Sequence, residues 1–157
     1  MKMPIPYEPK KKNRWLFRFP SELGIQQWWL MSASRPTITQ AEVELQFLNT
    51  STWVLGRFHW EAIDLTLRDA IGPSTAQAIM EWVRLHSESV TGRQGYAAGY
   101  KKDVEIEMLD PSGVVIEKWQ LQGTMLTTVN FGDLSMDDDG VADIVATLRF
   151  DRAILIF

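Results

Sequence analysis

The sequence predicts a single, mainly β domain with one α-helix and a short basic arm in front of it. In most segments long enough to form an element, apolar residues alternate with polar ones, which is the period of a half-buried strand. Turn sequences separate these segments, and only one stretch combines a helical cap with a helical period. A chain of 157 residues can build one continuous core. We therefore expect an antiparallel β-sandwich or barrel with one covering α-helix, over residues 14–157.

Residues 1–13 form the predicted arm. They contain three prolines and three successive lysines, and we expect them to be extended until they meet a partner. Residues 1–18 carry a charge of +5, so the other 139 residues carry −9 of the total of −4. This acidic body argues against binding nucleic acid through its phosphates. The arm is suited to an acidic patch on another copy or on a partner protein. The candidate contact residues are Lys10, Lys11, Lys12 and Arg14.

Four segments in the first half are predicted to be strands. Residues 15–19 alternate up to a proline, and residues 26–34 carry large rings on both faces. Residues 41–48 and 59–67 show clean alternation, with a loop over 49–57 between them.

One helix is predicted over residues 72–87. It starts at the sequence Gly-Pro-Ser-Thr, where proline suits the first turn and the small polar residues can cap it. Apolar residues then recur at helical spacing on one face, so this face should pack on the sheet. The glycine-rich segment 91–102 that follows is predicted to be a loop.

The second half is predicted to contain strands only. A tight hairpin is expected from the alternation on either side of an Asp-Pro-Ser-Gly turn. The segments are 103–109 and 114–123 around the turn 110–113, then 124–132 and 141–151 around the acidic turn 133–140, and a terminal strand over 152–157.

The composition excludes several kinds of chemistry. With no cysteine, the chain has no disulfide, thiolate nucleophile or cysteine-type metal site, and it has only two histidines. The aspartates of the turn 133–140 do not follow the spacing of a calcium-binding loop. We predict no catalytic residue, no metal and no cofactor. No apolar run approaches the about 20 residues of a membrane span, and no secretory signal is evident, so we expect a cytoplasmic protein without membrane contacts.

The seven tryptophans are divided between core and surface roles. Four lie within predicted elements, where burial is the simpler interpretation. Trp28, Trp29 and Trp53 are candidates for contacts between subunits, because large aromatic rings dominate interfaces energetically. The alternative is a small β-barrel that binds a sugar or another small ligand, with Trp28, Trp29 or Trp53 as a stacking platform.

Several segments together resemble the tail tube proteins of contractile-tailed bacteriophages. The resemblance runs from about residue 14 to residue 152 and rests on their order and spacing. The segments are NRWLFRF, VLGRFHWEAIDLTL, AIMEWV, YKKDVEIEMLDPSGVVIEKWQLQG and VNFGDLSMDDDGVADIVATLRFD. The haemolysin-coregulated tube protein of type VI secretion is similar to that family in fold.

The resemblance implies a structural virion protein without catalytic activity. It would be assembled in the host cytoplasm into stacked hexameric rings, with an inner β-barrel contributed by all six copies, and phage DNA would pass through the tube without specific binding. Implied partners are copies of itself, the tail sheath, the baseplate initiator, the tape measure protein and the terminator. A secretion-system tube or a baseplate tube initiator is the alternative within this class.

Polar strand faces are candidates for the lumen wall, where negative charge would repel DNA. The sequence offers three pairs and does not choose among them. The pairs are Glu42 with Glu44, Glu105 with Glu107, and Asp143 with Thr147.

Overall fold

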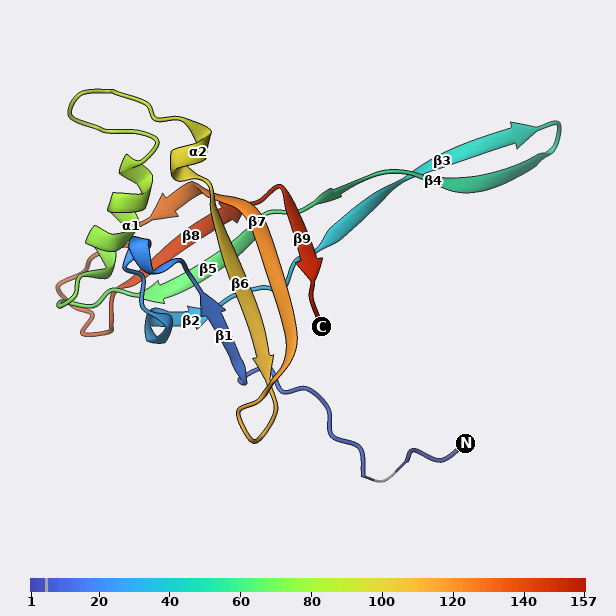
Figure 1. Ribbon diagram of the computed structural model, residues 1–157, viewed down its shortest axis with the longest axis horizontal. Coiled ribbons are helices and arrows are strands. Elements are labelled where there is room, and N and C mark those ends of the chain that lie inside the picture. The colour runs from blue at the N-terminus through green and yellow to red at the C-terminus, as the bar shows by residue number, and fades with distance from the viewer. Residues whose placement is uncertain (5) are drawn as a thin grey trace.

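Seven of the nine strands in the computed structural model form one antiparallel sheet that curls into a half-barrel (Figure 1). The structure describes residues 1–4 and 6–157. The strand order is β1-β6-β7-β8-β5-β2, and β9 pairs with β7. This confirms the predicted mainly β fold. The strands of the sheet are β1 (Trp15–Arg18), β2 (Leu30–Ser32), β5 (Ile63–Arg68), β6 (Lys102–Leu109), β7 (Val115–Asn130), β8 (Asp143–Arg149) and β9 (Arg152–Leu155).

Strand β7 joins the two halves of the sheet. Its first half pairs with β6 and β9, and its second half pairs with β8. The sequence predicted two strands here, over 114–123 and 124–132, whereas the structure has one. Gly123 explains the difference, because its φ of 68° lets the strand bend without ending. The predicted turn over 110–113 is confirmed, with the Asp110 carboxylate accepting the backbone N–H groups of Ser112 and Val114.

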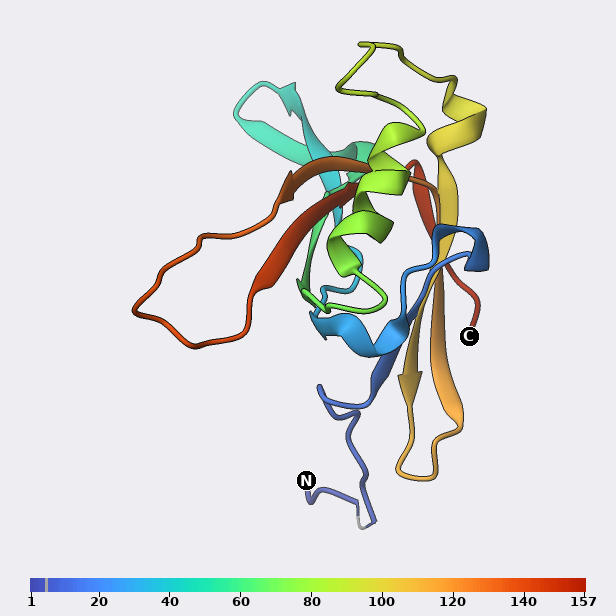
Figure 2. The same ribbon diagram turned by 90° about the vertical axis from the view of Figure 1, so that its left-hand side faces the viewer.

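Helix α1 (Thr75–Arg84) closes the core between the two halves of the sheet (Figure 2). Ser74 caps it by accepting the backbone N–H of Gln77 at 3.4 Å, as the predicted start requires. Ile79 and Trp82 are both 2% exposed and pack among the side chains of the sheet. A second, four-residue helix, α2 (Ala97–Tyr100), lies within the segment predicted to be a loop.

The segment 26–34 differs from its prediction as one strand. A 3₁₀ turn, η2 (Gln27–Trp29), precedes the short β2, and another, η1 (Ser21–Leu23), lies just upstream. The turn lets the two adjacent tryptophan rings point in different directions. Trp29 enters the core and is 3% exposed, whereas Trp28 points outward and is 69% exposed.

A long hairpin projects from the body (Figure 1). It consists of β3 (Ile38–Phe47) and β4 (Thr50–Trp60), so the loop predicted over 49–57 is in fact a strand. Phe47 pairs with Thr50 across a two-residue turn in which Leu48 has a φ of 54°. Leucine is uncommon in this left-handed conformation, so the sequence lacks the Asn-Gly type of signal that normally marks such a turn.

We expect Gly123→Ala to destabilise the fold by about 1–2 kcal/mol, the usual cost of a left-handed conformation for a residue with a Cβ. The added Cβ would also lie 2.2 Å from Oδ2 of Asp151, so that side chain would have to move. Urea unfolding measures the change in the free energy of unfolding. Gly99→Ala is the matched control, because a Cβ there meets no atom within 4 Å. Equal stability of the two variants would contradict this account of the bend in β7.

Candidate assembly surfaces

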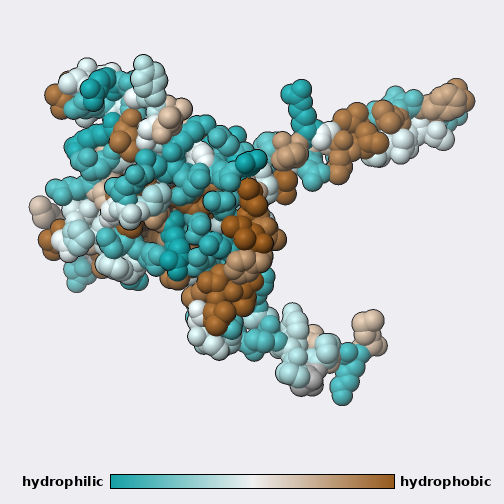
Figure 3. Space-filling view, viewed as in Figure 1, coloured by the Kyte–Doolittle hydropathy of each residue, from teal (hydrophilic) through white to brown (hydrophobic). Residues whose placement is uncertain are grey.

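The β3–β4 hairpin presents an apolar face that no described residue of the subunit covers. The strand register places Val43 opposite Val54, and the alternation brings Leu45 and Phe47 to the same face. Residues 38–59 are all exposed, and Phe47 and Leu48 at the end of the hairpin are 75% and 89% exposed. Figure 3 shows apolar side chains along this projection and a second apolar region on the body. The alternation of residues 41–48 predicted a two-faced strand, but alternation alone does not distinguish a face packed on a core from a contact surface.

The opposite face of the hairpin carries the first candidate lumen pair. Glu42 lies opposite Leu55 and Glu44 lies opposite Trp53. Trp53 is 59% exposed and belongs to a strand, not to the loop that was predicted.

The second candidate pair lies on the polar face of β6. Arg18 Nε on β1 is 2.9 Å from Glu107 Oε1, and Lys118 Nζ on β7 is 3.3 Å from Glu105 Oε2. Lys118 also lies 3.9 Å from Glu107. The two cations therefore balance the two carboxylates, and this face has mixed charge. Glu107 is 4% exposed, and within the described chain its Oε2 atom is buried without a hydrogen-bond partner.

The third candidate pair lies on β8, in the other half of the sheet. The Thr147 hydroxyl donates a 2.7 Å hydrogen bond to Oδ1 of Asp64 on β5. Oδ1 of Asp143 is buried and has no hydrogen-bond partner among the described residues. The structure thus places the three pairs on three separate elements, β3, β6 and β8.

The three candidate tryptophans do not form one platform. Trp29 is buried within the subunit, so its side chain offers almost no surface to another molecule. Trp28 lies on η2 beside β2, whereas Trp53 lies on the projecting hairpin (Figure 1). Trp28 and Trp53 are therefore exposed rings on separate elements.

The arm contacts its own subunit through Lys10. The Lys10 ammonium lies 2.6 Å from Oε1 of Glu117 on β7, and Arg14 lies 3.6 Å from Glu8 within the arm. Lys11 and Lys12 make no ion pair in the part of the chain that the structure describes, so they are available to a partner. Residues 1–4 and 6–13 form no helix or strand.

Glu117 is an acidic site that the sequence analysis did not identify. It is 8% exposed and accepts hydrogen bonds from Lys10, from Arg35 at 3.1 Å and from the Trp119 indole N–H at 3.1 Å. Burial raises the pKa of Glu117, but these donors outweigh it and hold the pKa below the ordinary value. The carboxylate is therefore charged at neutral pH.

The root of the hairpin is held by hydrogen bonds and rings. The Thr39 hydroxyl donates to Oε1 of Glu61 at 3.0 Å, and His59 Nε2 lies 2.7 Å from the same oxygen. The hydrogen bonds from Thr39 and His59 lower the pKa of the Glu61 carboxyl. Trp60, the last residue of β4, packs edge-on against Trp119 with ring centroids 6.4 Å apart.

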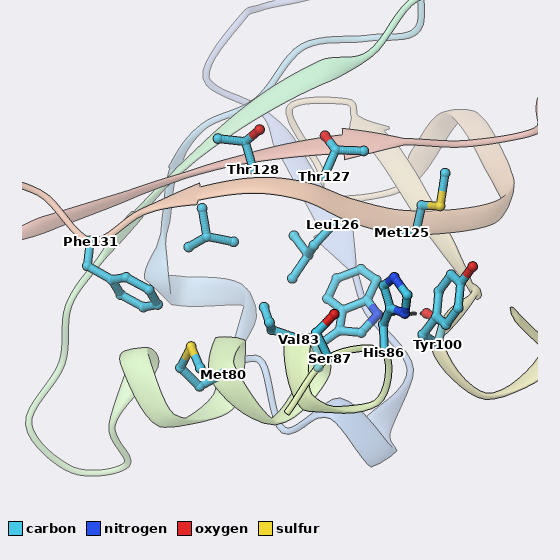
Figure 4. Close-up of a pocket in the computed structure, with 12 residues that line it drawn as sticks. Met80, Val83, His86, Ser87, Tyr100, Met125, Leu126, Thr127, Thr128 and Phe131 are labelled. Carbon is cyan, nitrogen blue, oxygen red and sulfur yellow. Dashed lines mark hydrogen bonds between the residues drawn. The ribbon is translucent and has the colours of Figure 1, made fainter. Parts of the chain in front are cut away.

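An open cavity of about 500 Å³ lies between α1 and the second half of β7 (Figure 4). Its lining includes Met80, Val83 and Leu126, and the rings of His86 and Tyr100 stack at 4.6 Å. No carboxylate is among the described lining residues, and the polar side chains of the lining include those of His86, Ser87 and Tyr100.

No metal centre or membrane helix is found in the described ranges. Residues 1–4 and 6–157 contain no group of three or more His, Asp or Glu placed to hold a metal ion. Within the same residues, every helix is too short or too polar to span a bilayer.

Comparison by sequence finds no matching family model and no matching curated protein. Comparison of structures finds close likenesses over nearly the whole chain. A chain of the anti-feeding prophage cap, described as a tube-terminating cap, superposes with a TM-score of 0.74 at 20% identity, covering 99% of this chain and 95% of that one.

A chain of the sheath-tube complex of an extracellular contractile injection system, PVC in its extended state, gives a TM-score of 0.74 at 18% identity, covering 96% of this chain and 93% of the other. Hcp1 from Flavobacterium johnsoniae gives 0.56 at 8% identity, with 91% and 94% covered. The chain therefore has the fold shared by tube and terminator proteins of contractile injection systems, which confirms the tail-tube-like fold that its sequence resemblance implied.

Proposed function

We propose that the protein is a structural, non-enzymatic subunit that stacks with copies of itself into the inner tube of a contractile injection apparatus. The observation that carries this proposal is the projecting hairpin, with residues 38–59 exposed and an uncovered apolar face. A two-stranded hairpin is at best marginally stable alone in water, and a large exposed apolar patch marks an interaction site. The fold shared with chains of tube and cap assemblies supports another copy of the chain as the partner that covers this surface.

The more specific role that we propose is the one implied by the resemblance of the sequence to phage tail tube proteins. The assembly is a stack of hexameric rings with a composite inner barrel, in a phage tail whose lumen conducts DNA, with the sheath, baseplate initiator, tape measure protein and terminator as neighbours. A terminator at the end of the tube is the second candidate, because the fold likeness includes a chain of a tube-terminating cap.

Electron microscopy of negatively stained protein, across a range of concentrations, tests the tube role. We expect rings or hollow tubes that become longer as the concentration rises. Rings that never extend would favour the terminator. A single species of 18.0 kDa at every concentration, unchanged when baseplate components are added, would contradict self-assembly.

We expect Leu45→Lys to abolish tube growth, because it places a charge in the apolar face of the hairpin. Gln46→Lys is the matched control, since the neighbouring side chain is also exposed but points to the opposite face of the hairpin, beside Glu44. Tube length in the same micrographs is the measurement. Full-length tubes from Leu45→Lys, or loss of tubes from Gln46→Lys alone, would show that the apolar face is not the contact.

We also propose that the basic arm binds an acidic surface of an adjacent subunit or of the sheath, chiefly through Lys11 and Lys12. Reversing both charges, Lys11→Glu with Lys12→Glu, should weaken sheath attachment or tube stability most at low salt, because salt screens exposed charges. Co-sedimentation of tubes with sheath protein measures this. Attachment that is unaffected at every salt concentration would exclude the arm from the contact.

A further inference from the structure

Glu117 holds together three parts of the chain that are distant in sequence. Its Oε1 atom accepts from Lys10 of the arm, and its Oε2 atom accepts from Arg35 and from Trp119. Lys10 and Arg35 lie 107 and 82 positions away along the chain. A carboxylate that is 8% exposed needs such partners, because burying a charge without compensation is costly.

Two of the three donors control the root of the β3–β4 hairpin. Arg35 lies three residues before β3 begins, so its hydrogen bond ties the chain entering the hairpin to β7. The Trp119 indole, held by Glu117, packs its ring against Trp60 at the end of β4. Both strands of the hairpin are therefore connected to Glu117, in addition to the contacts that Glu61 makes with Thr39 and His59. Residues 38–59 lie beyond the root and are exposed, so the direction in which the hairpin projects depends on the contacts at its root.

Lys10 is the donor that belongs to the N-terminal arm. Its side chain is 46% exposed and that of Arg35 is 56% exposed, but only Lys10 can leave together with the arm. It belongs to an arm that has no helix or strand in its described residues, so few backbone contacts oppose its movement. If Lys10 leaves, Glu117 keeps one cation and one indole, and Arg35 and Trp119 must adjust to satisfy both carboxylate oxygens.

We propose that Glu117 couples the N-terminal arm to the β3–β4 hairpin, with Lys10 holding the hairpin in one direction. An acidic partner surface that draws the arm away from Glu117 releases this restraint, and the hairpin root then moves. Lys10 is thus a positioning residue for the hairpin. The value of this coupling for stacking rests on the proposed tube function, but the coupling itself is a property of a single subunit.

Single-molecule energy transfer within one subunit tests the coupling. The chain has no cysteine, so Ser51→Cys on the hairpin and Ser112→Cys in the tight turn before β7 take the two dyes alone. The measurement is made at nanomolar concentration, where copies are separated and tube formation plays no part. Lys10→Gln is compared with Lys11→Gln, which removes the same charge from the neighbouring position, and circular dichroism verifies that each variant is folded.

We expect Lys10→Gln to shift and broaden the transfer-efficiency distribution, and Lys11→Gln to leave it unchanged. Glu117→Gln should produce the same shift or a larger one if it remains folded. An unchanged distribution in folded Lys10→Gln would overturn the coupling, and so would equal shifts in the two lysine variants. Neither result depends on whether the protein forms tubes, so failure of the coupling and failure of the tube function are distinguished.

Discussion

A two-stranded hairpin forms a single layer, so β3 and β4 cannot bury their own apolar face. The register gathers Val43, Leu45, Phe47 and Val54 on that face, and the body offers no cover because its core is already closed by α1 and the sheet. Water is a poor solvent for such a surface, and only a second molecule can remove it from water. The isolated subunit is therefore a folded body carrying an element that depends on contact with another molecule for its full stability.

The net negative charge of the sequence does not make every candidate lumen face negative, because cations lie beside some of the carboxylates in the structure. The acidic balance of residues 19–157 suggested a wall that repels DNA, yet Glu105 and Glu107 share Arg18 and Lys118. Carboxylates without a described ion pair lie elsewhere, including Glu42 and Glu44 on the hairpin and the aspartates of the exposed turn 133–140. A lumen lined by the polar face of β6 would therefore have mixed charge. Such a wall avoids binding its cargo by local neutrality rather than by repulsion.

The sequence predicted elements where local patterns and tertiary structure agree, as in β6, β8 and the capped start of α1. It missed β4, because the left-handed conformation falls on Leu48 rather than on Asn49, and the turn contains no glycine. It also missed the 3₁₀ turn that separates Trp28 from Trp29, since alternation alone placed both rings on a strand. Glu117 had no local signal at all, because its two cationic donors lie 107 and 82 positions away along the chain.

The buried residues that stabilise the fold and the exposed residues available for assembly lie in different parts of the chain. The described core contains no residue from 38–59, and the hairpin joins the body only through its root, where Trp60 packs against Trp119. Substitutions on the hairpin can therefore alter contacts between molecules without disturbing the core of the body. The root cannot vary so freely, because Trp119 belongs to β7, the strand that joins both halves of the sheet. A load applied to the hairpin in an assembly would pass through Trp60 and Glu117 into that central strand.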